Sequence, residues 1–236
     1  MEGLIEKMEY VIILIILWLV AFLLKTLFGY NLKKIKKEVE NKELDEIVKK
    51  YPENKVICEE YLKKLNNEKV EIEENDGTEN SLYIAISNKI LIGNIKNSYS
   101  RIQTIAHECL HSIQDRKLQI FNFVYSNIYI LFFIIITLMA LFKALPYKML
   151  FNFLLMFMGL VYYMVRTFLE NDAMIKARYL AKEYMEEKKI SSKEEIEKIV
   201  DGFDKINNIG IKCVNYSMFF NVTMINIVFS LVCLIR

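Results

Sequence analysis

Residues 104–111 read Thr-Ile-Ala-His-Glu-Cys-Leu-His and contain the pattern H-E-x-x-H. In a helix, His107 and His111 lie one turn apart on the same face, because residues four positions apart are neighbours there. Two imidazoles in that position can bind one Zn²⁺, and the glutamate between them, here Glu108, is the usual general base that activates a water on the metal. The stretch therefore predicts a helix with two zinc ligands and a catalytic carboxylate.

The histidine content strengthens this interpretation. The chain has only two histidines in 236 residues, and both lie in the motif. The competing explanation is a chance match on an ordinary amphipathic helix, a risk that every short motif carries. Uncharged neighbours such as Ile105, Ala106 and Leu110 fit a helix that is buried behind a metal.

The composition predicts a membrane protein with a soluble part. Hydrophobic residues make up 54% of the chain, which is high for a soluble domain, and charged residues make up 25%, which is high for a chain wholly within lipid. The net charge of +2 indicates no class of partner, and no basic stretch with interleaved aromatic residues predicts nucleic-acid binding.

The cysteines show no C-x-x-C spacing, so a disulfide framework is not expected. We interpret them as small buried residues in a reducing compartment. Cys109 lies two positions after His107, so its side chain points away from the zinc face and it is excluded as a ligand. The four residues are Cys58, Cys109, Cys213 and Cys233.

Four apolar runs are long enough to cross a bilayer as helices, which takes about 20 residues. An acidic start favours an uncleaved first span over a signal peptide. The runs cover residues 10–28, 124–142, 149–169 and 211–235. The expected order is a first transmembrane helix (1–30), a catalytic part with the motif (31–120), a transmembrane hairpin (121–169), helices with the third zinc ligand (170–210) and a fourth transmembrane helix (211–236).

Four lysines directly after the first span predict the orientation of the chain. By the positive-inside rule, basic residues beside a span mark its cytoplasmic end. The lysines are Lys33, Lys34, Lys36 and Lys37. We therefore expect a multi-pass protein of the cell membrane whose catalytic part lies on the cytoplasmic face.

The soluble part is expected to begin with helices and to contain the motif helix. Apolar residues recur at helical spacing through 32–67, and Pro52 divides this stretch into two helices. The motif helix is expected over 98–116, with Ser98 or Ser100 as its N-cap.

Between these helices, the period of the apolar residues changes to two. Alternation at 70–72 and 82–86, and a turn at 88–89 into the apolar run 90–92, predict three short strands in a small antiparallel sheet just before the motif helix. Zinc peptidases with this motif commonly place an edge strand there, to which an extended substrate can add. The predicted fold is therefore a mainly α membrane protein with four transmembrane helices and a small α+β zincin-like catalytic domain.

A catalytic zinc needs a third protein ligand, and the chain has no third histidine. The hairpin formed by the second and third spans returns Glu170 to the side and depth where His111 left, so Glu170 is our choice. Asp172 stays open as the alternative ligand, and Asp172 or Asp115 could instead orient a histidine through its other ring nitrogen. The competing explanation is that Glu170 and Asp172 are ordinary acids in the first turn of a helix.

These motifs resemble the bacterial membrane family of neutral zinc metallopeptidases known as the YugP-like family. The likeness rests on A-H-E-x-x-H-x-I-Q at residues 106–114, on E-x-D-A at residues 170–173 after a hairpin, and on the order of spans and motifs. The chain has Cys-Leu between the histidines where the family usually has Val-Gly. It has Met174-Ile175-Lys176 where the family usually has Ser-Arg-Arg, so Lys176 or Arg178 would take over contact with substrate or the oxyanion.

The motifs and the resemblance together imply a membrane-embedded, gluzincin-like zinc endopeptidase with one Zn²⁺ per chain. Its partners would be the lipid bilayer and a protein or peptide substrate that can itself be membrane-anchored, with no nucleic acid. Two alternatives stay open: a non-catalytic membrane adaptor that retains the zincin fold, and a peptidase of the CAAX-processing or stress-protease type. The second motif of the latter, E-x-x-A-D, differs from E-N-D-A here. A channel or transporter is disfavoured, because the spans lack facing charged residues.

Overall fold

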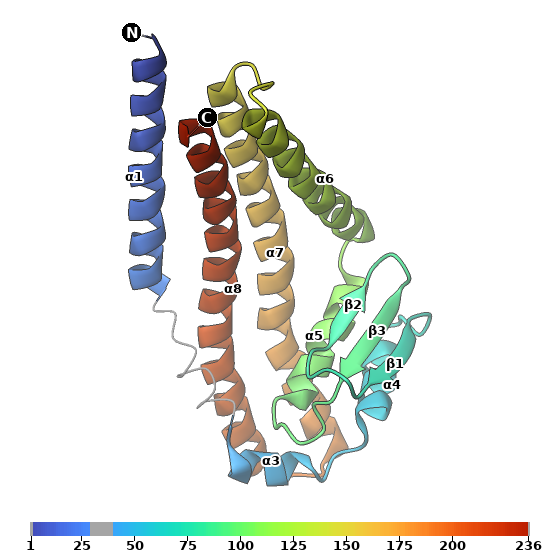
Figure 1. The fold of residues 1–236 in the computed structure, drawn as a ribbon. Coiled ribbons are helices and arrows are strands. Elements are labelled where there is room, and N and C mark those ends of the chain that lie inside the picture. The colour runs from blue at the N-terminus through green and yellow to red at the C-terminus, as the bar shows by residue number, and fades with distance from the viewer. Residues whose placement is uncertain (1, 29–39, 236) are drawn as a thin grey trace. The chain divides into compact units, whose positions relative to one another are not determined.

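The computed structural model describes residues 2–28 and 40–235, and these form two compact units (Figure 1). We call residues 1–30, 121–168 and 212–236 the apolar unit, and residues 31–120 and 169–211 the motif unit. The lysines Lys33, Lys34, Lys36 and Lys37, on which the predicted orientation depends, lie outside the described residues.

Four helices of the described chain are long and apolar enough to cross a membrane. They are α1 (Glu2–Phe28), α6 (Arg116–Leu141), α7 (Lys148–Lys188) and α8 (Lys193–Ile235). Large apolar side chains on these helices are exposed, for example Phe22, Leu131 and Phe157. An apolar surface of this extent is typical of contact with lipid rather than with water. The prediction of a multi-pass membrane protein is confirmed at this level.

Helices α7 and α8 are longer than the predicted spans. With 41 residues, α7 is about 61 Å long, roughly twice the thickness of the hydrocarbon core of a bilayer. The competing explanation, that Glu170 and Asp172 are acids in the first turn of a helix, is therefore wrong: Glu170 lies inside α7, where no glycine or proline interrupts residues 160–188. Likewise, the predicted fourth span is the second part of α8.

Helix α8 begins directly after Ser191 and Ser192. The Ser192 hydroxyl accepts from the backbone N–H of Glu195, and the Glu195 carboxylate accepts from the backbone N–H of Ser192. This reciprocal pair is a capping box, which satisfies two backbone donors at the helix N-terminus.

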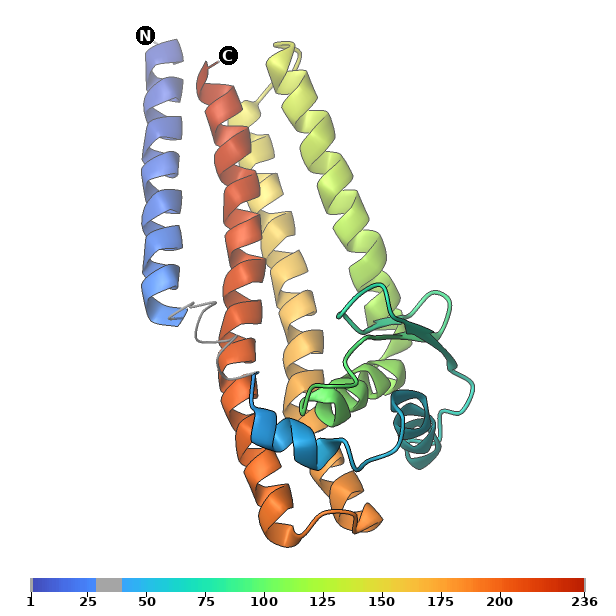
Figure 2. The same cartoon turned by 60° about the horizontal axis from the view of Figure 1, so that its bottom comes forward.

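Three shorter helices belong to the motif unit (Figure 2). They are α3 (Lys42–Val48), α4 (Asn54–Lys64) and α5 (Arg101–Ile113). The break between α3 and α4 contains Pro52, as predicted. Ser100 occupies the N-cap position of α5 but makes no side-chain capping bond, and α5 ends three residues before the predicted end at Arg116.

The sheet has three short strands, as predicted, but it is mixed rather than antiparallel. Its strands are β1 (Glu71–Asn75), β2 (Leu82–Ile84) and β3 (Lys89–Gly93), in the spatial order β1-β3-β2. β2 pairs antiparallel with β3, whereas β1 pairs parallel with it.

The loop between β1 and β2 explains the parallel pair. This loop passes the end of β3, where the backbone N–H of Asn94 donates to the Thr78 carbonyl and that of Gly93 donates to the Ser81 hydroxyl. A Cβ at Gly93 would come within 2.7–2.8 Å of the backbone of residues 78–80, so only glycine permits this approach. The chain therefore crosses to the far side of β3 instead of forming a hairpin.

The core of the motif unit gathers around α5, which contacts α4, β2 and β3 (Figure 2). Its members are fully buried apolar residues of the short helices, of β3 and of the parts of α7 and α8 in this unit. On α7, small residues at Ala173, Ala177 and Ala181 are completely buried. Since alanine lets neighbouring backbones approach closely, Glu170 is held on a helix that packs tightly within the same core as α5.

Candidate metal centre

Helix α5 presents the two histidines on the face opposite its apolar core residues. Ile102, Ile105 and Cys109 are fully buried, whereas the His107 and His111 side chains are partly exposed. The two imidazole rings meet edge to face with centroids 4.5 Å apart, and their Nε2 atoms are 3.0 Å apart. Both rings therefore direct the same nitrogen to one point.

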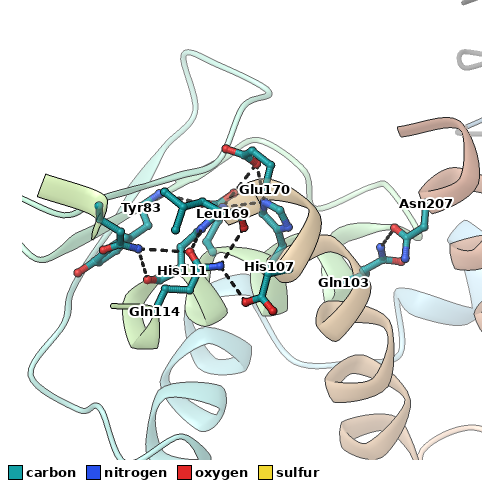
Figure 3. Close-up of polar contacts among 11 residues, drawn as sticks. Tyr83, Gln103, His107, His111, Gln114, Leu169, Glu170 and Asn207 are labelled. Carbon is teal, nitrogen blue, oxygen red and sulfur yellow. Dashed lines mark hydrogen bonds and ion pairs between the residues drawn. The ribbon is translucent and has the colours of Figure 1, made fainter. Parts of the chain in front are cut away.

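Glu170 on α7 directs its carboxylate to that point (Figure 3). Its Oε2 lies 3.4 Å from His107 Nε2 and 3.6 Å from His111 Nε2. One ligand atom from each of the three residues falls within 4.8 Å of the others. Among the described residues, this is the cluster of histidine, cysteine and acidic side chains with the geometry to hold a metal ion.

The charges of the site oppose the effect of burial on His111. Burial alone would lower the pKa of the imidazole, but its contact with Glu170 and the negative charges of Glu108 and Glu170 raise it above its ordinary value. The three side chains thus form a site that attracts positive charge.

Glu108 is buried beside this cluster, with 7% of its surface exposed. Burial raises the pKa of its carboxyl, as does the charge of Glu170, while His107 and His111 act in the opposite direction. Its Oε2 accepts a hydrogen bond from the backbone N–H of Tyr83 at 2.7 Å. Because Tyr83 lies in β2 and this N–H is directed at α5, the outer edge of the sheet faces the motif helix.

Gln114 links His111 to α7. Its Oε1 lies 2.8 Å from His111 Nδ1, and its Nε2 donates to the backbone carbonyl of Leu169 at 2.8 Å and to Asp172 Oδ2 at 3.1 Å (Figure 3). The residue follows the last turn of α5 in an extended conformation, which lets its side chain fold back to His111. It therefore joins the helix that carries the two histidines to the helix that carries Glu170.

The two acids predicted to orient a histidine do not touch one. Asp172 contacts Gln114, and it is Gln114 rather than Asp172 that contacts His111. Asp115 Oδ1 accepts from the backbone N–H of Lys117 and so caps α6, which begins at Arg116, before the predicted span at 124–142.

The two basic residues predicted to contact substrate are paired with acids. Lys176 Nζ lies 2.6 Å from Asp172 Oδ1, one turn along the exposed side of α7. Arg178 donates to Asp204 on α8 at 2.6 Å and lies over the ring of Tyr179. Lys176 therefore lies near the network of Gln114, whereas Arg178 joins α7 to α8.

The cysteines carry no disulfide, and Cys109 faces the core of the motif unit rather than the histidines. Its Sγ lies 3.6 Å from Cys58 Sγ, with both residues fully buried. This position agrees with the exclusion of Cys109 as a ligand.

Sequence reasoning missed the roles of Gln114 and Tyr83. For Gln114 a signal existed, because it lies three residues after His111 and closes the A-H-E-x-x-H-x-I-Q pattern. For Tyr83 none existed, since the contact uses its backbone N–H, which every residue except proline has.

Comparison of the chain with protein-family models, with curated proteins and with solved structures gives no significant match. The resemblance to the YugP-like family therefore stays a prediction that rests on its motifs and their order.

Proposed function

We propose that this protein is a membrane-embedded, zinc-dependent endopeptidase. The observation that carries the proposal is the convergence of His107, His111 and Glu170, which come from two different helices, on one point beside Glu108. Two imidazole nitrogens and one carboxylate oxygen are a ligand set that suits Zn²⁺ and leaves a fourth tetrahedral position for a water or substrate. The donor chemistry therefore fits the metal that the motif predicts.

The residues divide the chemical work. Zinc held by the three ligands would supply a Lewis acid that makes a water acidic and polarises the scissile carbonyl. Glu108 would accept the proton of the attacking water and then donate it to the leaving amine. Its burial supports this role, because a raised pKa brings a carboxylate closer to the range in which a base works near neutral pH.

The substrate we propose is a protein or peptide segment close to a membrane. Helices α7 and α8 each contain an apolar stretch and continue into the motif unit, so the site belongs to a chain that is tied to the bilayer. The position of β2 at the edge of the sheet, beside Glu108, supports an extended substrate, since strands at a sheet edge can pair with extended peptides.

The test compares the wild type with Glu108→Gln and Glu170→Ala in detergent or liposomes. Zinc is measured by elemental analysis, and cleavage is measured with an internally quenched peptide library. Glu108→Gln should retain zinc and lose cleavage by more than the roughly 10²–10⁴-fold typical of general acid–base catalysis, because one carboxylate serves both proton transfers. Glu170→Ala should lose both zinc and cleavage.

Three outcomes would change the proposal. Normal cleavage by Glu108→Gln would contradict the hydrolytic mechanism and favour the adaptor. Full zinc occupancy in Glu170→Ala with loss in Asp172→Ala would make Asp172 the ligand. Stoichiometric zinc in a variant that lacks both histidines would exclude the site.

We also propose that the motif unit lies on the cytoplasmic side of the cell membrane. Single cysteines introduced at Asn75 and Glu194, both exposed in the motif unit, would test this orientation by thiol labelling. They should react only after the cells are permeabilised, and labelling from outside intact cells would reverse the assignment.

A further inference from the structure

Gln114 holds His111 by a neutral amide, and the surrounding partners fix how that amide is turned. Its Nε2 faces the backbone carbonyl of Leu169 at 2.8 Å and the carboxylate of Asp172 at 3.1 Å. Both partners only accept hydrogen bonds, so the amide nitrogen must lie on that side. The amide oxygen is then the atom that faces His111.

A second amide supports the same assignment. Gln119 Nε2 donates to the backbone carbonyl of His111 and lies 3.5 Å from Gln114 Oε1. A donor on this side again requires an oxygen on Gln114. The orientation of the Gln114 side chain is therefore set from both ends.

This orientation determines where His111 carries its proton. Gln114 Oε1 can only accept, and it lies 2.8 Å from His111 Nδ1, so Nδ1 must be the protonated nitrogen of the neutral ring. The lone pair is then on Nε2, the atom that faces His107 Nε2 and Glu170 Oε2. The ring is thus prepared to bind a cation before one arrives.

We propose that Gln114 is a positioning residue for the metal site, with two separate tasks. It fixes the Nδ1–H tautomer of His111, and it ties α5 to α7 at the two residues that flank the Glu170 turn, Leu169 and Asp172. Histidine ligands are held through their second nitrogen by a carboxylate, a backbone carbonyl or water in most metal sites. Here the carboxylate of Asp172 accepts from the Gln114 amide nitrogen, and the Gln114 amide oxygen contacts His111 Nδ1.

This inference rests on the proposed function for the identity of the metal but not for the tautomer. The first measurement therefore uses the metal-free full-length protein. With only two histidines in the chain, ¹⁵N-histidine labelling gives a spectrum of two imidazoles, and a His107→Gln variant assigns them. Protonated and unprotonated ring nitrogens have distinct ¹⁵N shifts, so the tautomer of His111 is read directly.

The matched pair of variants is Gln114→Met and Gln103→Met. Both replace an amide between α5 and another helix by an apolar side chain of similar length, since Gln103 donates to Asn207 on α8 (Figure 3). Only Gln114 touches an imidazole. We expect Gln114→Met to abolish the preference for Nδ1–H and to weaken Zn²⁺ binding by about 10–100-fold, the usual range for loss of an outer-shell partner. Gln103→Met should change neither measurement.

A polarity exchange separates the two tasks. In Gln114→Glu, the carboxylate still accepts from His111 Nδ1 but repels Asp172, so the tautomer should persist while Zn²⁺ binding weakens. Adding Asp172→Asn gives the carboxylate a donor again, so the double variant should regain most of the lost affinity.

The proposal is overturned if Gln114→Met keeps the Nδ1–H tautomer, or if Gln103→Met weakens Zn²⁺ binding to the same extent, because both would assign a general structural role. If the tautomer changes as expected but the wild type binds no Zn²⁺, the positioning of His111 stands and the proposed function fails. The two conclusions are thus tested independently.

Discussion

Helix α5 carries two buried polar clusters that differ in how their atoms are satisfied. In its first turn, the Arg101 guanidinium is 2% exposed and donates to the carbonyls of Val48, Tyr51 and Pro52 and to the Asn54 side chain at 2.8–2.9 Å. In its last turns, His107 and His111 meet Glu170 through atoms that are all acceptors in the state that binds a metal.

The difference distinguishes a polar cluster that stabilises the fold from one that could bind a ligand. Around Arg101 each acceptor faces a donor, and within the described part of the chain the Nε of Arg101 is the atom of this cluster left without a partner, so the cluster stabilises the connection between α3 and α4. Around His111 acceptors face one another, an arrangement that lowers stability unless a proton or cation joins them. Burial and polarity are common to both clusters, and only the convergence of like atoms distinguishes the second as a candidate metal site.

The largest expected effect removes a ligand from the second cluster. His111→Ala should weaken Zn²⁺ binding by more than about 100-fold, which exceeds the cost of losing an outer-shell partner. The metal-free protein should change in free energy of unfolding by only about 1 kcal/mol, because the hydrogen bond lost from Nδ1 to Gln114 Oε1 is offset in part by the relief of the facing acceptors. Competition with a zinc chelator and denaturant unfolding of the metal-free form measure the two quantities, and a strongly destabilised variant that still binds zinc would contradict the comparison.

For the cluster around Arg101 we expect a large loss of stability and no loss of zinc affinity. Arg101→Met leaves four acceptors, three of them in buried hydrogen bonds, without their donor, so the free energy of unfolding should fall by about 3 kcal/mol or more, while the folded fraction keeps its zinc affinity. Arg178→Met is the control, since its ion pair with Asp204 is partly exposed and should contribute no more than about 1 kcal/mol. Equal losses in both variants would mean that the carbonyl cage around Arg101 is not a major source of stability.

Much of the helical architecture could be predicted, because apolar periodicity and length determine which segments cross a membrane. The position of Glu170 near the histidines was also predicted, from the return of a hairpin. The predictions that failed depend on contacts between residues that are distant in sequence. The antiparallel sheet was wrong, since strand direction is decided by a loop that passes Gly93 at close range. The full length of α7 was not predicted, because a change from apolar to charged residues marks the end of a span but does not end a helix whose other face stays buried.

The partners of the site were less predictable than its ligands. Spacing identifies His107 and His111, but it does not show that Asp172 reaches His111 only through Gln114. Asp115 was predicted as a residue that could orient a histidine, but α6 begins at Arg116 and Asp115 caps that helix instead. Outer partners follow from side-chain directions, which a one-dimensional pattern does not contain.

An intermediate effect on stability is expected at the loop between β1 and β2, which passes Gly93. In Gly93→Ala, a Cβ would lie 2.7–2.8 Å from backbone atoms of residues 78–80, so the loop before β2 must shift. We expect a loss of about 1–3 kcal/mol in the free energy of unfolding, the range for overpacked sites. Gly77→Ala is the control, because its nearest neighbour is the Asn75 side-chain oxygen at 3.2 Å. If both variants are equally stable, close approach at Gly93 does not determine the course of the loop.

The smallest effect, and the one that separates the two clusters by pH, concerns His111. Its pKa is lowered by burial but raised overall by Glu170 and by the charge of Glu108. A raised pKa means that the proton stabilises the metal-free fold below the unfolded-state pKa of about 6.5, and that this contribution is lost as pH rises through the folded-state pKa. Zinc binding has the opposite sign, because the proton on Nε2 must leave first, so affinity should fall as pH is lowered through the same range. Arg101 stays charged throughout and adds no such dependence.

The contribution of His111 is isolated by unfolding the metal-free wild type and His111→Gln at pH values between about 5.5 and 8.5, which bracket the ordinary pKa of histidine. A stability difference between the two proteins that grows with pH would show that the site repels rather than attracts a proton, and the convergence of acceptors at this point would then need another explanation.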